Sequence, residues 1–281
     1  MSAFIQTILC WVLVAVNWFC GLVSLPNLPA FFPTLDLTKF ELTWSDEFDY
    51  TEFNYGKWGG HFHDGQRAVP RRDGYWMHDL CTFTDGALHI KTEYREADAA
   101  GNPAGWYSDG IDTSRSFRQA YGYFEARCIL PKGFGLWSAF WIFCNGVGNV
   151  DGSGADGAEI DVFESPNYKK GLQVQRDSVS SAIHYDGYGV NHTSKGWGNF
   201  YAADAYEKYH TYGLEWNDKE YIFYIDGHET FRTDFGLSHA EEYVILSTEV
   251  GDWTGDINAN TEPPSDFIID YVRIYQYKDL L

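Results

Sequence analysis

Positive charge is scarce in this chain of 281 residues, which carries 20 Lys and Arg side chains against 40 Asp and Glu side chains. The formal net charge of -20 repels nucleic acids, anionic membranes and sulfated polymers, and it suits a neutral or cationic partner. General solubility explains the same charge equally well. The composition therefore excludes partners more firmly than it identifies one, and we expect no nucleic-acid partner.

Cysteine is also sparse. Cys10 and Cys20 lie in an apolar segment near the start of the chain, which leaves Cys81, Cys128 and Cys144 in the remainder. Because three is an odd number, at most one disulfide can form among them, and no pair has the C-x-x-C spacing of a metal site. The sequence therefore implies neither a complete disulfide framework nor a cysteine metal centre.

The apolar segment, residues 4–25, contains no charged side chain. It is long enough to span a bilayer and long for the core of a signal peptide. We expect residues 1–25 to be a signal or anchor segment, residues 26–39 a Pro-rich linker, and residues 40–281 the folded domain. The protein is predicted to be secreted or extracytoplasmic. Cleavage of residues 1–25 and membrane anchoring through residues 4–25 stay open as alternatives.

Short β-like runs fill the predicted domain, and aromatic residues make up 18% of the chain. Apolar and polar residues alternate over 87–94, 121–130, 138–143, 158–164, 179–186, 210–216, 220–227, 243–250 and 267–277. Asp226-Gly227 joins two such runs and predicts a two-residue hairpin. The pattern predicts an all-β fold, an antiparallel sandwich or barrel.

One of these runs contains three carboxylates, Glu159, Asp161 and Glu164, within "GAEIDVFES". Side chains alternate along a strand, so Glu159 and Asp161 share a face, whereas Glu164, five positions after Glu159, faces the other way. Strict alternation would then bury Glu164 among apolar residues at a high cost. A β-bulge near Val162 and Phe163 returns Glu164 to the acidic face, and we predict that bulge.

Paired carboxylates on one face are typical of retaining glycoside hydrolases, in which one attacks the sugar and the other protonates the leaving oxygen. Asp161 lies between Glu159 and Glu164 and adds negative charge, which raises the pKa of at least one neighbour. An acidic, solvated strand face is the structural alternative.

The chain resembles glycoside hydrolase family 16, whose bulged signature E-x-D-x-x-E is met by "EIDVFE". Supporting matches lie at residues 42–49, 121–143 and 265–276. The resemblance implies a jelly-roll sandwich of two curved antiparallel sheets (concanavalin A-like) with a concave cleft. It also implies that Glu159 is the nucleophile, Asp161 its helper and Glu164 the acid/base, with no cofactor required for catalysis.

Aromatic residues near this motif fit a glycan cleft, because sugars present flat apolar faces. Trp137 and Trp141 are four positions apart and share a strand face, with Phe140 on the other; core packing is the alternative. The resemblance implies sugar-binding roles for Trp137, Trp141, His184, Trp253, Arg118 and Tyr168.

The bulged motif accompanies laminarinases, which act on β-1,3-glucan, and also agarases, carrageenases and porphyranases. The acidic charge disfavours sulfated galactans, so we predict an endo-acting enzyme on a neutral β-1,3-glucan. Mixed-linkage glucan, a galactan, transglycosylation and a non-catalytic glucan-binding module remain alternatives. The resemblance also implies a structural calcium ion, with Asp270 as the matching ligand, and we expect a monomer.

Overall fold

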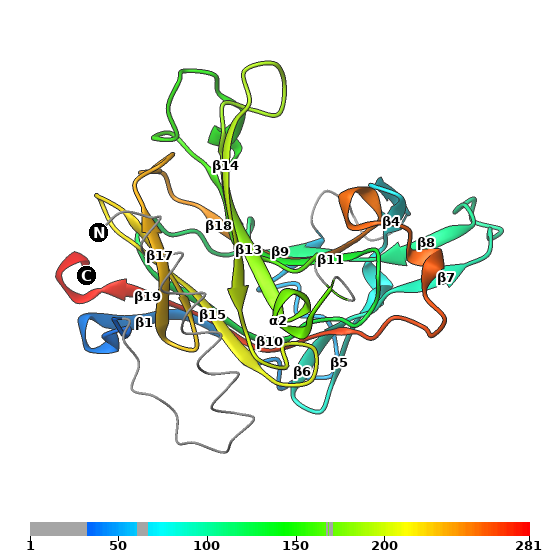
Figure 1. Cartoon of the computed structure of the whole chain (residues 1–281). Helices are drawn as coiled ribbons and strands as arrows, with labels where there is room; N and C mark the ends of the chain where they lie inside the picture. The colour runs from blue at the N-terminus through cyan, green and yellow to red at the C-terminus, as the bar shows by residue number, and fades with distance from the viewer. Residues whose placement is uncertain (1–32, 61–66, 167, 169–170) are drawn as a thin grey trace.

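Antiparallel β-strands dominate the computed structural model, which describes residues 33–60, 67–166, 168 and 171–281 (Figure 1). Two large sheets pack against each other as a jelly-roll sandwich. This architecture confirms the predicted all-β fold. The predicted segment 1–25 lies outside the described residues, as do residues 26–32 of the predicted linker.

The first large sheet, which we call sheet 1, has the strand order β17-β16-β15-β10-β19-β6-β5, and β1 pairs with β19. Its strands are β1 (Phe40–Asp46), β5 (Cys81–Thr84), β6 (Ala87–Ile90), β10 (Gly122–Ile129), β15 (His210–Trp216), β16 (Tyr221–Ile225), β17 (His228–Thr233) and β19 (Phe267–Tyr277). Asp226 and Gly227 connect β16 to β17 with φ angles of 51° and 72°. Left-handed φ angles at both positions suit a two-residue hairpin and confirm that prediction.

The second large sheet, sheet 2, has the order β14-β13-β12-β11-β18-β9-β2. Its strands are β2 (Gly59–Gly60), β9 (Gly110–Asp112), β11 (Leu136–Phe143), β12 (Glu159–Glu164), β13 (Ser178–Tyr185), β14 (Thr193–Tyr201) and β18 (Tyr243–Val250). The carboxylate strand β12 therefore lies inside the sheet, with β11 and β13 as its neighbours.

A smaller sheet, sheet 3, has the order β3-β4-β8-β7, and its β7–β8 hairpin projects at one side of the molecule (Figure 1). Its strands are β3 (Val69–Arg71), β4 (Gly74–Trp76), β7 (Glu93–Arg95) and β8 (Gly105–Ser108). Helices are short: η1 (Leu37–Lys39), η2 (His78–Leu80), η3 (Asn145–Gly148), α2 (Gln173–Arg176), η4 (Asp252–Thr254), η5 (Ile257–Ala259) and η6 (Lys278–Leu280). Among the described residues, no helix is long and apolar enough to cross a membrane.

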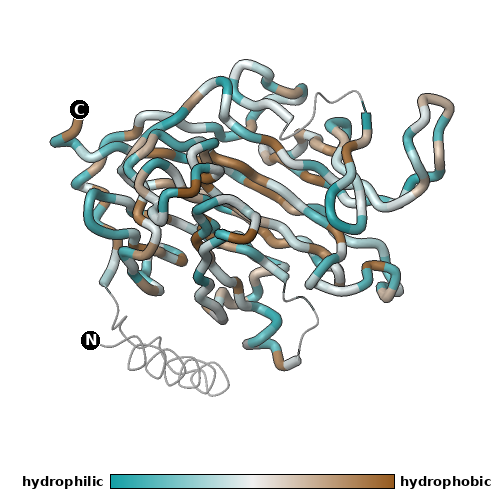
Figure 2. Tube along the Cα trace, turned by 90° about the horizontal axis from the view of Figure 1, so that it is seen from above, coloured by the Kyte–Doolittle hydropathy of each residue, from teal (hydrophilic) through white to brown (hydrophobic). Residues whose placement is uncertain are grey.

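The main core lies between sheets 1 and 2 and draws on both. Phe124 and Ile274 from sheet 1 and Phe140, Ile160 and Leu246 from sheet 2 are all fully buried in one apolar cluster. Figure 2 shows hydrophobic residues gathered along the central strands. Burial of these apolar faces is the main stabilising contribution to a sandwich, and it fixes which face of each strand is left for a site.

The structure also describes the three cysteines and part of the predicted linker. Cys81, Cys128 and Cys144 are all buried free thiols, so none of the three forms a disulfide. Part of the predicted linker pairs with the domain, since Thr34 forms a β-bridge with His228 and the Leu35 N–H donates to the Gly227 carbonyl at 2.9 Å.

Candidate active site

A β-bulge in β12 places its carboxylates on one face. Phe140 of β11 pairs with Phe163, and the next residue, Trp141, pairs with Asp161, so Val162 is the extra residue. The pairing with β13 also shifts register between Asp161 and Glu164. This confirms the predicted bulge, and Phe163 packs inward with its ring centroid 4.3 Å from that of Tyr212.

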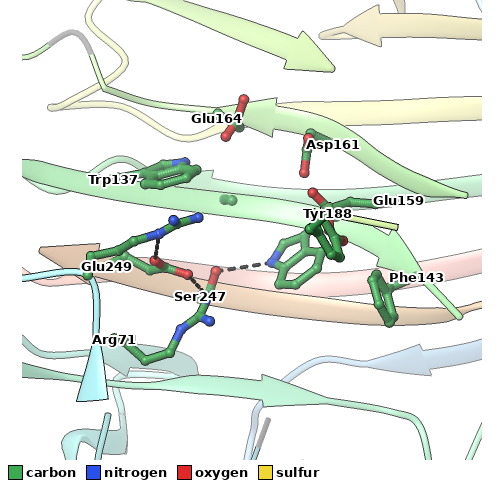
Figure 3. A pocket seen from close by; sticks show the side chains of 12 residues that line it. Arg71, Trp137, Phe143, Glu159, Asp161, Glu164, Tyr188, Ser247 and Glu249 are labelled. Atoms are coloured by element: carbon green, nitrogen blue, oxygen red, sulfur yellow. Dashed lines mark hydrogen bonds and ion pairs between the residues drawn. The ribbon is translucent and has the colours of Figure 1, made fainter. Parts of the chain in front are cut away.

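All three carboxylates face a cavity of about 360 Å³ on sheet 2 (Figure 3). β11 and β18 form its floor beside β12, the turn after β3 closes one side, and the loop between β13 and β14 closes another. The lining residues are Arg71, Arg72, Trp137, Ala139, Trp141, Phe143, Glu159, Asp161, Glu164, Tyr188, Ser247 and Glu249.

The aromatic lining comes from alternate positions of β11. Trp137, Trp141 and Phe143 face the cavity, whereas Phe140 lies in the core, as the spacing predicts. The indole N–H of Trp141 donates to Ser247 Oγ at 3.1 Å, and this hydrogen bond orients the ring in the cavity. An apolar floor with a few polar groups is the chemistry of a small-molecule or glycan site.

Burial and mutual repulsion raise the pKa values of the three carboxylates. The pKa of Glu159 is raised to about 7, chiefly by burial and then by the charge of Asp161. Burial, followed by the charge of Glu249, raises the pKa of Asp161. The pKa of Glu164 is raised well above its ordinary value, again by burial first and by Asp161 second. The cavity therefore holds at least one proton near neutral pH.

His184 joins this group from β13, where it pairs in register with Glu159. Its Nε2 lies 3.3 Å from Asp161 Oδ2 and 3.9 Å from Glu159 Oε1, and its Nδ1 lies 2.9 Å from His192 Nε2. The donor atoms of Glu159, Asp161 and His184 all lie within 4.8 Å of one another, a spacing that one cation could bridge. The histidine places a polar ring beside the carboxylates without lining the cavity itself.

An ion-pair cluster forms the opposite wall of the cavity. Arg71 hydrogen-bonds Glu249 Oε1, and Arg72 Nε donates to Glu249 Oε2 at 2.8 Å. Arg72 also pairs with Asp252 at 3.2 Å, and its guanidinium lies 4.8 Å from the Trp137 ring centroid. These contacts compensate both arginine charges and place Arg72 over the tryptophan.

The remaining predicted residues lie at different distances from the cavity. Trp253 is half exposed and meets Trp137 edge-on at 5.2 Å, so it borders the cavity. Arg118 lies over the Tyr243 ring at 4.7 Å, and Tyr168 packs against Tyr206 at 5.0 Å. The described residues that line the cavity include neither Arg118 nor Tyr168.

Asp270, the predicted calcium ligand, forms an ion pair with Arg127 at 2.5 Å. A calcium ion takes about six to eight oxygen ligands, which one carboxylate already paired with a guanidinium does not supply. The calcium site stays a prediction, and no step below uses it.

Several cavity residues were missed from sequence: Tyr188, Phe143, Arg71, Arg72, Ser247 and Glu249. Ser247 and Glu249 could have been predicted from the sequence, because two polar side chains two positions apart on a predicted strand indicate a face that is not packed in the core. Tyr188 and Arg72 lie in turns and Arg71 ends the three-residue strand β3, so no period identifies the face of these residues.

Comparison with known proteins agrees with this geometry. Residues 40–277 match the family model described as the GH16 domain of β-porphyranases A–D. A glucan endo-1,3-β-glucosidase A1 from Niallia circulans is 28% identical over 85% of this chain and 38% of its own length. A β-glucanase from Rhodothermus marinus is 27% identical over 85% of this chain and 86% of its own.

A solved structure has the same fold. The laminarinase catalytic domain from Thermotoga maritima superimposes with a TM-score of 0.68 and 26% identity, covering 85% of this chain and 98% of that one. The family model spans nearly the whole described domain, including Glu159, Asp161 and Glu164, which line the cavity. The chain belongs to glycoside hydrolase family 16.

Proposed function

We propose that this protein is a retaining endo-β-glucanase that cleaves β-1,3 linkages, with Glu159 as nucleophile, Glu164 as acid/base and Asp161 as helper. The observation that carries the proposal is that one bulged strand directs Glu159 and Glu164 into one cavity. Two carboxylates in one cleft can perform both halves of a double displacement.

In the first step, a carboxylate oxygen of Glu159 attacks the anomeric carbon. The glycosidic C–O bond breaks, and Glu164 gives its proton to the departing oxygen. Burial and the neighbouring charges, which raise the pKa of Glu164, keep that proton available near neutral pH. The product is a glycosyl ester of Glu159 and a shortened glucan with a free hydroxyl.

In the second step, water attacks the same carbon from the side of Glu164, whose carboxylate takes the proton of the water. The ester bond breaks, and the electron pair returns to Glu159. Two inversions restore the original anomeric configuration. A sugar hydroxyl in place of water gives transglycosylation through the same intermediate, which product lengths from a labelled oligosaccharide acceptor distinguish.

The charges around the cavity support a neutral substrate. Four carboxylates and two guanidinium groups line it, and both Arg71 and Arg72 are paired with Glu249. An anionic sugar would meet a wall whose positive charges are already compensated. Relatives named endo-1,3-β-glucosidase and laminarinase support the β-1,3 linkage.

A sulfated galactan is the second candidate. The matching family model is that of β-porphyranases, and Arg71 and Arg72 are the cationic side chains at the cavity. Cleavage of porphyran would require that a sulfate displaces Glu249 from these arginines.

A reducing-sugar assay on laminarin, lichenan, agarose, carrageenan and porphyran tests both candidates. We expect release from laminarin, with lichenan second, and none from the Glu159→Gln variant. Proton NMR of the first product should show the β-anomer. Equal release by wild type and Glu159→Gln would refute the assignment, and binding of laminarin without release would identify a glucan-binding module.

We also propose that the protein acts outside the cytoplasm as a monomer. The proposal rests on the uncharged segment 4–25 and on the polymeric substrate. Cell fractionation, mass spectrometry of the mature N-terminus and gel filtration test export, cleavage and oligomeric state in turn.

A further inference from the structure

Tyr188 makes the closest polar contact with the proposed nucleophile. It lies in the loop between β13 and β14, lines the cavity, and donates its hydroxyl hydrogen to Glu159 Oε2. Figure 3 shows the phenol beside the Glu159 carboxylate. No step of the mechanism above uses this residue.

The loop holds Tyr188 in place through the two residues before it. Asp186 and Gly187 have φ angles of 60° and 71°, which turn the chain sharply at the end of β13. Asp186 Oδ1 accepts the N–H groups of Asp151 and Gly152 at 3.0 and 2.9 Å. The Gly187 N–H donates to the Val147 carbonyl at 2.6 Å. The phenol is thus presented by a turn that is anchored to the segment 147–152.

The two oxygens of Glu159 have different surroundings. Oε2 accepts the Tyr188 hydrogen bond, whereas Oε1 lies 3.9 Å from His184 Nε2, beyond hydrogen-bond range. A carboxylate held through one oxygen keeps a fixed orientation and leaves the lone pairs of the other oxygen for attack.

We propose that Tyr188 is a positioning residue that holds Glu159 Oε2, directs Oε1 to the anomeric carbon, and assists release of the sugar from the covalent intermediate. This inference rests on the proposed function, because it requires a glycosyl ester of Glu159.

Tyr188 assists release of the sugar because the negative charge on its hydrogen-bond acceptor, Glu159 Oε2, increases during that step. In the ester, Oε1 is bonded to the sugar and Oε2 is a neutral carbonyl oxygen, which accepts a weaker hydrogen bond than a carboxylate does. As water attacks, the bond between Oε1 and the anomeric carbon breaks and negative charge returns to the carboxylate. The Tyr188 hydrogen bond strengthens during this step, so it favours deglycosylation over glycosylation. Burial beside Glu159 raises the pKa of Tyr188, so the phenol keeps its proton throughout.

The Tyr188→Phe variant removes only the hydroxyl. With 2,4-dinitrophenyl β-laminaribioside in a stopped-flow instrument, we expect a burst near one equivalent of dinitrophenol per enzyme, followed by slow turnover. Relative to wild type, kcat should fall about tenfold, the scale of one hydrogen bond to a charged group. KM should fall by a similar factor, so kcat/KM changes less than threefold. Loss of packing alone would raise KM and produce no burst.

Two further variants distinguish failure of the proposed role of Tyr188 from failure of the proposed function itself. Tyr185→Phe removes a hydroxyl from β13, where the ring packs on Phe235 at 5.5 Å, and it should behave as wild type. Glu159→Gln should give neither burst nor turnover. An inactive Glu159→Gln variant beside a Tyr188→Phe variant with wild-type kcat and KM would overturn the role of Tyr188 alone. Wild-type protein that releases no dinitrophenol, or a Glu159→Gln variant that matches it, would overturn the proposed function as well.

Discussion

Glu159 and Glu164 line the same cavity although five positions separate them along β12. An odd spacing puts two residues on opposite faces of a regular strand. The unpaired Val162 adds one residue to β12, so Glu164 returns to the face that carries Glu159. The alternative would bury Glu164 in the core between the sheets, where an ionised carboxylate is costly. The bulge is therefore the local feature on which the proposed chemistry depends.

Deletion of Val162 should remove the bulge and make the carboxylates alternate strictly. Glu164 then moves by one residue, about 3.3 Å, toward Glu159. We expect kcat on laminarin to fall about 100-fold or more, since misplacement of about 1 Å already has effects of that size. The matched control is Val162→Ala, which keeps the residue count and should stay active despite its smaller side chain. Wild-type activity in the deletion variant would contradict the role of the bulge.

Replacement of Glu164 should affect substrates according to their leaving group. Glu164→Gln is expected to lower turnover of laminarin by about 100-fold to 10,000-fold, the usual contribution of a general acid. An aryl glycoside with a dinitrophenol leaving group needs no protonation, so its release in the first step should change little. Equal losses on both substrates would show that Glu164 is not the acid.

The Asp161→Asn variant should move the acid limb of the pH profile of kcat/KM to lower pH. The wild-type limb is expected near pH 7, because Glu159 must be ionised to attack and its pKa is about 7. The charge of Asp161 contributes to that elevation, so its removal lowers the pKa of Glu159 and keeps the nucleophile ionised to lower pH. We expect kcat itself to fall at least tenfold through loss of the helper. A limb that stays in place or moves to higher pH would contradict the coupling between the two carboxylates.

Thermal stability should rise in Glu164→Gln at neutral pH. The pKa of Glu164 is higher in the folded protein than its ordinary value of 4.5, so between these two values the folded state binds more protons than the unfolded state. Stability from this group is therefore present below pH 4.5 and is lost as the pH rises toward the folded value. We expect Tm of the variant to exceed that of wild type by about 2–4 °C at pH 7, the effect of about 1 kcal/mol in a domain of this size. The difference in Tm between variant and wild type should vanish near pH 4. An equal difference at pH 7 and pH 4 would show that the raised pKa of Glu164 is not its cause.

Much of the fold could be predicted because long strands have a clear period. β15, β18 and β19 have the bounds that the alternating runs indicate. Strands such as β2, β3 and β9 have only two or three residues, too few to show an alternation, and they form through pairing with partners distant in sequence. His184 could be predicted only by resemblance, although its register with Glu159 explains its position beside the carboxylates.

The sequence by itself determined the all-β class, the position of the bulge and the three carboxylates on one strand face, because each follows from local alternation and from the cost of burying a charge. Tertiary structure alone decided what surrounds them. Arg72 meets Glu249 across 177 positions of the chain, and Tyr188 meets Glu159 across 29. Such contacts depend on how the loops pack over sheet 2, and the alternation of residues along a strand does not predict the conformation of a loop.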